Sequence, residues 1–139
     1  MNLKKNTEEI VGAFLAVFRE LKKKLSYGNP LFHLPLAQME ALRFVHETKQ
    51  PAMKEISDHF GITPPSATAL INHLVNLGYV TRIANGKDRR GIRISLTAKG
   101  LNIFNKASKQ HCQRLEKLLS KLSEKEKQEF LKILNKMIN

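Results

Sequence analysis

The sequence predicts a mainly α fold of the α+β class, with several helices and one β-hairpin. Apolar residues recur at three- and four-residue steps along most of the chain, which is the spacing of one helix face. The period changes to two over residues 79–96, which indicates paired strands. With 139 residues and one cysteine, the chain has the size of a single domain that folds without an internal disulfide.

Two amphipathic helices are predicted in the first fifty residues. The first covers residues 7–25, with Glu8 and Glu9 in its first turn, where negative charge complements the helix dipole. A segment with glycine and proline then ends it. Pro35 is suited to the first position of a second helix, which we expect over residues 35–47.

Two shorter helices joined by a tight turn follow. The first is predicted over residues 53–60, and Gly61 stands at its C-terminal cap position. Thr63 is a good N-cap and Pro64 a good first residue for the next helix, which we expect to end at Leu77. Such a pair with a three- or four-residue turn is a helix-turn-helix.

A β-hairpin with a long, charged tip is predicted after these helices. Its loop, residues 84–91, carries the turn signal Asn85-Gly86. The positions expected to share a strand face are Tyr79, Thr81 and Ile83 in the first strand, and Ile92, Ile94 and Leu96 in the second.

Two further helices complete the chain. Thr97 caps a long helix that we expect to reach about Leu122, and Ser123 with Glu126 forms a capping box for the last helix. The first and last helices carry more apolar surface than a compact helix-turn-helix core requires. We interpret this surface as an interface.

The charge of the chain predicts a polyanionic partner. The formal net charge is +12, and residues 79–100 hold the densest excess, with six basic side chains and one acidic one. Nucleic acid and an anionic membrane surface both fit such an excess. The longest apolar run, residues 10–18, is too short to span a bilayer and lacks a signal-peptide cleavage site. We therefore expect a soluble, cytoplasmic protein.

The segments DRRGIRISLTAKG (Asp88 to Gly100) and LVNLGYVTR (Leu74 to Arg82) resemble the MarR family of winged helix-turn-helix regulators. The resemblance covers the chain in the order and length of its helices. It implies a homodimer in which each subunit places one helix in the major groove of double-stranded DNA and one wing along the minor groove. The implied organisation is a single domain, residues 1–139, with dimerisation helices in 1–34 and 101–139 and the winged helix-turn-helix in 35–100.

The recognition helix departs from the family pattern because PPSATALINHLVN contains no lysine or arginine. Asn72, Ser66 and Thr68 are still able to hydrogen-bond to base edges, and the Thr68 methyl group is able to contact thymine. The alternative is an ordinary polar face exposed to water. The candidate DNA-binding residues here are Thr63, Ser66, Thr68, Asn72 and His73.

We expect the wing to supply much of the attraction to phosphate. Arg90 is the candidate for the minor groove, where a guanidinium meets focused negative potential. Lys87 and Arg89 are candidates for phosphate contacts, and Asp88 for holding an arginine in position. The alternative is a charged loop that serves only solubility. DNA contact is favoured because the charge density and the preceding helix-turn-helix agree.

Other site classes have less support. No nucleophile and base are placed together and no glycine-rich phosphate loop is present, so we expect neither an enzyme nor a cofactor. The histidines lack metal-ligand spacing, so we expect no metal site. Cys112 is interpreted as a packing or surface cysteine and not as a redox sensor. Aromatic residues able to line an effector pocket, but more typical of a core, are Phe14, Phe18, Phe32, Phe44 and Phe104.

The leading hypothesis is a sequence-specific DNA-binding transcriptional regulator, a homodimeric repressor that a small-molecule effector releases from DNA. The first alternative is a non-specific nucleic-acid-binding or architectural winged-helix protein, which an uncharged recognition helix also fits. The second is a winged-helix module that mainly binds protein. No residue is assigned to effector binding.

Overall fold

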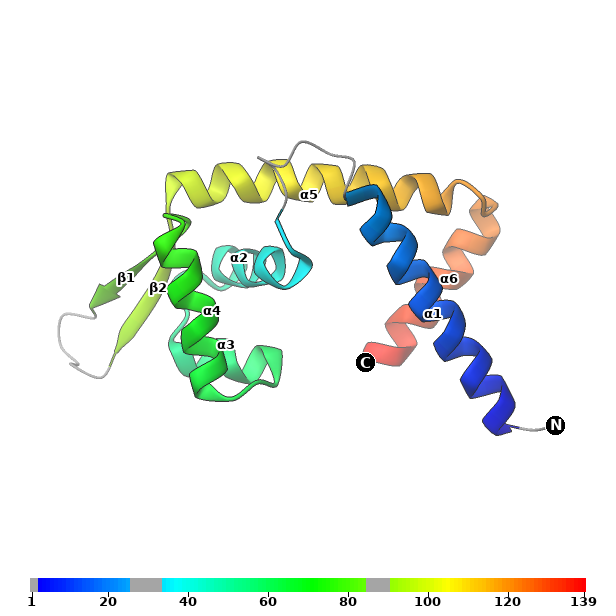
Figure 1. The fold of residues 1–139 in the computed structure, drawn as a ribbon, viewed down its shortest axis with the longest axis horizontal. Coiled ribbons are helices and arrows are strands. Elements are labelled where there is room, and N and C mark those ends of the chain that lie inside the picture. Colours follow the sequence, from blue (N-terminus) through cyan, green and yellow to red (C-terminus); the bar gives the residue numbers. More distant parts are fainter. Residues whose placement is uncertain (1–2, 26–33, 85–90) are drawn as a thin grey trace. The chain divides into compact units, whose positions relative to one another are not determined.

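The computed structural model describes the backbone of residues 3–25, 34–84 and 91–139, and these residues form six helices and a two-stranded sheet (Figure 1). The mainly helical α+β class is therefore confirmed. The chain divides into two compact units, residues 31–108 and residues 1–30 with 109–139. The elements are α1 (Leu3–Leu25), α2 (Leu36–Thr48), α3 (Met53–Phe60), α4 (Pro64–Asn76), β1 (Val80–Ala84), β2 (Ile92–Leu96), α5 (Ala98–Leu119) and α6 (Glu124–Ile138).

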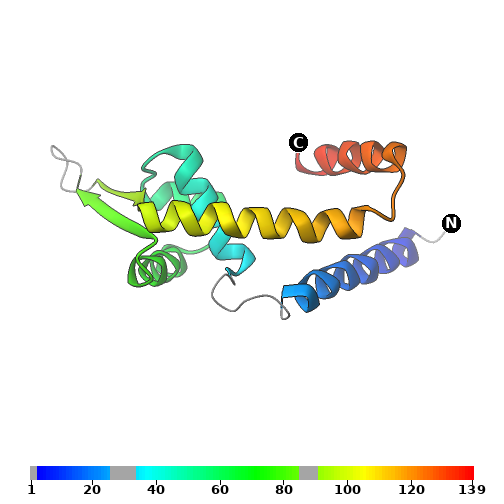
Figure 2. The same ribbon diagram turned by 90° about the horizontal axis from the view of Figure 1, so that it is seen from above.

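The unit of residues 31–108 contains the hydrophobic core. Helices α2, α3 and α4, both strands and the first part of α5 all contribute to it, and the strands lie at the N-terminal end of α5 (Figure 1, Figure 2). Burial of these side chains is the main favourable term in folding of the unit. The buried hydrophobic residues are Leu34, Met39, Ala41, Leu42, Val45, Ile56, Ala67, Ile71, Leu74, Val80, Ile94 and Ala107.

The helix-turn-helix is confirmed, and its local signals explain its bounds. Helix α3 ends at Phe60 because Gly61 adopts the left-handed conformation, with φ of 61°, which a residue without Cβ adopts at little cost. The Thr63 hydroxyl accepts a hydrogen bond from the Ser66 amide at 3.4 Å and donates one to Ser66 Oγ at 2.9 Å. With Pro64 as the first helical residue, this cap starts α4 where the sequence predicted.

The hairpin is antiparallel, and Arg82 pairs with Ile94 in its register. Ile94 is fully buried, and on β1 the buried residue is Val80. Side chains alternate across a strand, so Val80 and Arg82 share the face that β1 turns toward the core. Only Val80 is buried on β1, because Thr81, Arg82 and Ile83 are all exposed.

A short third segment joins β2 to the start of α3. The Ile94 amide donates to the Pro51 carbonyl at 2.9 Å, and Ala52 forms an antiparallel bridge with Arg93. Pro51 lacks an amide hydrogen, so it joins this ladder only as an acceptor. The second strand is thereby attached to the helix-turn-helix.

The start of α5 packs closely on the chain between α4 and β1. Thr97 caps the helix as predicted, because its hydroxyl accepts from the Gly100 amide at 3.0 Å. It also donates to the Gly78 carbonyl at 2.6 Å. Gly100 is buried, and a Cβ there would overlap the carbonyl oxygen of Tyr79 and lie 2.8 Å from its carbonyl carbon. Position 100 therefore requires glycine.

Two predicted helix bounds differ from the structure by three residues or more, and the other bounds agree within one residue. Helix α1 begins at Leu3 and not at residue 7, because residues 3–6 include no proline or glycine to prevent an earlier start. Glu8 and Glu9 consequently lie beyond its first turn. Helix α5 ends at Leu119, three residues early, where the Ser120 hydroxyl bonds back to the Lys117 carbonyl at 2.6 Å.

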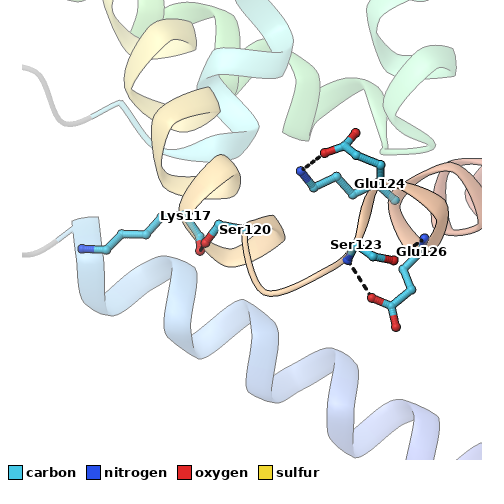
Figure 3. Close-up of polar contacts among 6 residues, drawn as sticks. Lys117, Ser120, Ser123, Glu124 and Glu126 are labelled. Carbon is cyan, nitrogen blue, oxygen red and sulfur yellow. Dashed lines mark hydrogen bonds and ion pairs between the residues drawn. The ribbon is translucent and has the colours of Figure 1, made fainter.

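The unit of residues 1–30 and 109–139 contains α1, the end of α5 and α6. The predicted capping box starts α6: Ser123 N donates to Glu126 Oε2 at 2.7 Å, and Glu126 N to Ser123 Oγ at 3.2 Å (Figure 3). Among the side chains described in this unit, none is buried. Its exposed large apolar residues are Ile10, Val11, Phe14, Leu15, Val17, Phe18, Leu115, Phe130, Leu131, Ile133, Met137 and Ile138.

Replacing Gly100 by alanine should destabilise the protein. At an exposed helix position this change stabilises by up to about 1 kcal/mol, but here the methyl group meets a backbone carbonyl. Such overpacking lowers the free energy of unfolding by about 1–3 kcal/mol, measurable by urea denaturation. The control is Asn102→Ala, an exposed change two residues along α5, with an effect within about 0.5 kcal/mol. A Gly100→Ala variant as stable as the wild type would contradict the packing described.

Thr63→Ala should reduce stability by about 1 kcal/mol, because the first turn of α4 loses its cap. Thr63→Ser keeps the hydroxyl and should stay close to the wild type in thermal unfolding. Equal losses in the two variants would show that the methyl group, and not the capping hydroxyl, is what matters at this position.

Candidate nucleic-acid interface

Helix α4 presents the side chains that the sequence proposed for base contacts. Ser66, Thr68, Asn72 and His73 are all exposed, as is Thr63 before the first turn. The opposite side of the helix is fixed in the core by the buried residues Ala67, Ile71 and Leu74. The orientation of the exposed face is therefore set by packing.

The candidate residues of α4 form two rows. At about 100° per residue, Thr68 and Asn72 lie within about 40° of each other, and Ser66 and His73 within about 20°. The strip between the rows includes Ala69, which is exposed and carries only a methyl group. A flat surface could approach this strip closely, with a polar row on either side.

Thr63 has a structural role that the sequence also predicted. Its hydroxyl is engaged with both the amide and the hydroxyl of Ser66, so these two side chains hold the first turn of α4 together. Thr68, Asn72 and His73 lie farther along the helix. Thr63 and Ser66 thus form a capping pair at the start of α4, and the other three candidates lie in its later turns.

Sequence reasoning did not single out Arg82, which lies at this face. Its guanidinium donates a hydrogen bond to Oδ1 of Asn72 on α4. Both side chains are exposed. The sequence signal for this placement is the spacing of two residues between Val80 and Arg82, which puts both side chains on the same face of β1. A helix whose thirteen residues include no acidic or basic side chain apart from His73 thus has an arginine beside it.

The base of the wing is anchored by a second arginine. Arg93 Nη1 lies 3.2 Å from Oε1 of Glu55 and donates to the Gln50 carbonyl at 3.4 Å. The same Glu55 oxygen accepts from the Ala52 amide at 3.3 Å. One carboxylate therefore joins the start of α3 to β2. Lys87, Asp88, Arg89 and Arg90, the residues predicted for the wing tip, lie outside the described residues.

The described residues also bear on the metal, cysteine and aromatic candidates. Within residues 3–25, 34–84 and 91–139, no group of three or more His, Cys, Asp or Glu side chains is placed to hold a metal ion. The Cys112 thiol is exposed. Phe44 and Phe104 pack against the core, whereas Phe14 and Phe18 are exposed, and Phe32 lies outside the described part of the chain.

Among the helices of the described residues, none combines the length and the apolar character that crossing a bilayer requires.

Comparison with known proteins shows a similarity to one family. Residues 34–91, which include α2, α3, α4 and β1, match the sequence model of the MarR family. The chain is 27% identical over 123 residues to the uncharacterized HTH-type transcriptional regulator YwhA of Bacillus subtilis (strain 168), and the match covers 88% of each chain.

Solved structures show the same fold. The chain resembles S. aureus MepR in its DNA complex with a TM-score of 0.72 and 23% identity, over 91% of each chain. It resembles Staphylococcus aureus MarR in complex with salicylate and kanamycin with a TM-score of 0.80 and 19% identity, over 96% of this chain and 90% of that one. In sequence over residues 34–91 and in its fold, this chain is similar to the MarR family of winged helix-turn-helix transcriptional regulators.

Proposed function

We propose that the protein is a homodimeric repressor that binds a specific double-stranded DNA site and leaves it when a small-molecule effector binds. The observation that carries this proposal is the pairing of an exposed α4 with a hairpin anchored at its base to α3. An anchored hairpin and a helix fixed by its buried side form one rigid reading head. Rigid support of this kind is what precise contacts with base edges require.

In the proposed complex, α4 lies in the major groove. Its two rows, Thr68 with Asn72 and Ser66 with His73, provide polar groups for base edges on either side of Ala69. The close approach at Ala69 suits a helix that carries no long charged side chain. DNA binding is supported by S. aureus MepR, a protein of similar fold whose structure is that of a DNA complex.

The wing contributes the electrostatic part of the proposal. Arg90 enters the minor groove, Lys87 and Arg89 contact phosphates, and Asp88 orients an arginine. The anchor from Arg93 to Glu55 supports the wing from below. The net charge of +12 favours any DNA sequence, so specificity has to come from the contacts of α4 and from groove shape.

We attribute dimerisation to the exposed apolar side chains of the terminal helices. In α6, Leu131 and Ile138 are 59% and 79% exposed, and in α1, Ile10 is 63% exposed. Exposed apolar side chains in this number on two helices are typical of an interface. We assign it to a second copy of the chain. Twofold symmetry then predicts a pseudo-palindromic site with half-sites one helical turn apart, about 34–36 Å.

Effector release and location complete the proposal. The complex of Staphylococcus aureus MarR with salicylate and kanamycin supports a small-molecule step for this fold. An effector releases DNA only if it binds the DNA-free conformation more tightly. The location expected for a regulator with a DNA partner is the cytoplasm.

The uncharged α4 favours one competing function, a non-specific nucleic-acid-binding or architectural protein. The two functions differ in whether selection from random duplex DNA enriches one site. The proposal predicts enrichment of a site that binds about a thousandfold or more tightly than random duplex. Equal binding to all duplexes would establish the non-specific function instead.

On the selected site, Arg90→Ala should lower affinity and reduce the slope of log affinity against log salt by about one. The reason is that one cation no longer replaces a counterion on the DNA. The matched control is Lys125→Ala on α6, which removes the same charge from an exposed position outside the winged helix. Unchanged affinity and slope for Arg90→Ala would remove this residue from the proposed wing contacts.

Leu131→Asp should weaken dimerisation, because the dimer interface would then bury two carboxylates, one from each copy. We expect the dimer dissociation constant, from sedimentation equilibrium, to rise at least about 100-fold. Phe14→Asp on α1 should act in the same way, and Lys125→Asp on α6 should not. If the Leu131→Asp and Phe14→Asp variants both dimerise like the wild type, the terminal helices do not form the interface.

A further inference from the structure

The contact between β1 and α4 lies at the face proposed to meet DNA. The register fixes Arg82 opposite Ile94, whose side chain is fully buried, so the strand position of Arg82 is set by the core and not by a loop. From there its guanidinium donates to Oδ1 of Asn72. Both side chains are exposed, and neither contributes to the core.

The chemistry of arginine fixes which end of the Asn72 amide faces β1. A guanidinium has five N–H donors and no acceptor, whereas an asparagine amide has one acceptor oxygen and an NH₂ donor group. Only the oxygen of Asn72 is therefore able to meet Arg82. The NH₂ group is left on the other side of the amide, away from the guanidinium.

We propose that Arg82 is a positioning residue that makes Asn72 a hydrogen-bond donor toward DNA, and that the pair selects a keto base, guanine or thymine, at one position of each half-site. This inference rests on the proposed function. In the major groove, guanine presents two acceptors, O6 and N7, and thymine presents the acceptor O4. Adenine has one acceptor, N7, beside the N6 donor, and cytosine presents the N4 donor, so a group that only donates is matched best by a keto base.

The alternative for an asparagine on a recognition helix is the bidentate contact with adenine, in which the amide accepts from N6 and donates to N7 at the same time. That contact requires the oxygen and the nitrogen to point at one base edge together. With Oδ1 turned toward Arg82, the amide presents its nitrogen alone. Loss of Arg82 restores the freedom of the amide to turn.

The test is selection from random duplex with the full-length wild type and three variants. The wild type should prefer guanine or thymine over adenine at one position per half-site, by about 5- to 100-fold. Arg82→Gln should lose this preference or shift it to adenine, with the other positions unchanged. Arg82→Lys, which also only donates, should keep the preference for the keto base.

Asn72→Asp reverses the chemistry, because a carboxylate only accepts. It should bind DNA more weakly overall and favour adenine or cytosine at that position. Lys125→Gln on α6 controls for the loss of one positive charge and should leave the selected site unchanged. Urea denaturation should give all variants wild-type stability within about 0.5 kcal/mol, as for exposed substitutions.

The outcomes separate this inference from the function on which it rests. If Arg82→Gln weakens binding equally for all sequences and keeps every base preference, Arg82 contributes only charge and the inference is wrong, while the proposed function stands. If the wild type enriches adenine at the position that Asn72→Asp changes, the donor assignment is also wrong. A wild type that enriches no site contradicts the proposed function itself.

Discussion

The attachment of β2 to the start of α3 is the interaction on which the DNA-reading unit depends. An isolated two-stranded hairpin is only marginally stable in water. Here the Ile94 amide bonds to the Pro51 carbonyl at 2.9 Å, and the Glu55 carboxylate lies 3.2 Å from Arg93. The close contact of Gly100 with the Tyr79 carbonyl fixes the other end of the hairpin against α5. These contacts fix the base of the wing on the helix-turn-helix.

Such an anchor also explains how a helix without lysine or arginine could read DNA. In the proposed function, charge on the wing attracts DNA of any sequence, and α4 has only to supply contacts at short range. The contact of Arg82 with Asn72 adds a cation from the hairpin to the polar row of α4. Strand register therefore places Arg82 of the hairpin beside α4, because the register decides which face of β1 turns toward the core.

The sequence predicted local features well and non-local ones less well. The bounds of α3, the left-handed Gly61 and the Ser123 capping box depend on neighbouring residues, and the structure confirms each. Alternation along β1 defined two faces but not which of them is buried, because that depends on pairing and packing far along the chain, so Arg82 was overlooked. Helix α1 starts four residues before its predicted first residue because residues 3–6 include no proline or glycine. The assigned roles of the wing tip stay predictions, since those residues lie outside the described part of the structure.

Hydroxyl-radical footprinting of the wild-type protein on its selected duplex tests the central claim most directly. A homodimer of anchored reading heads predicts two protected segments about one helical turn apart, each flanked by protection of the adjacent minor groove where the wings lie. A single protected segment, or uniform protection that does not depend on sequence, would contradict the account.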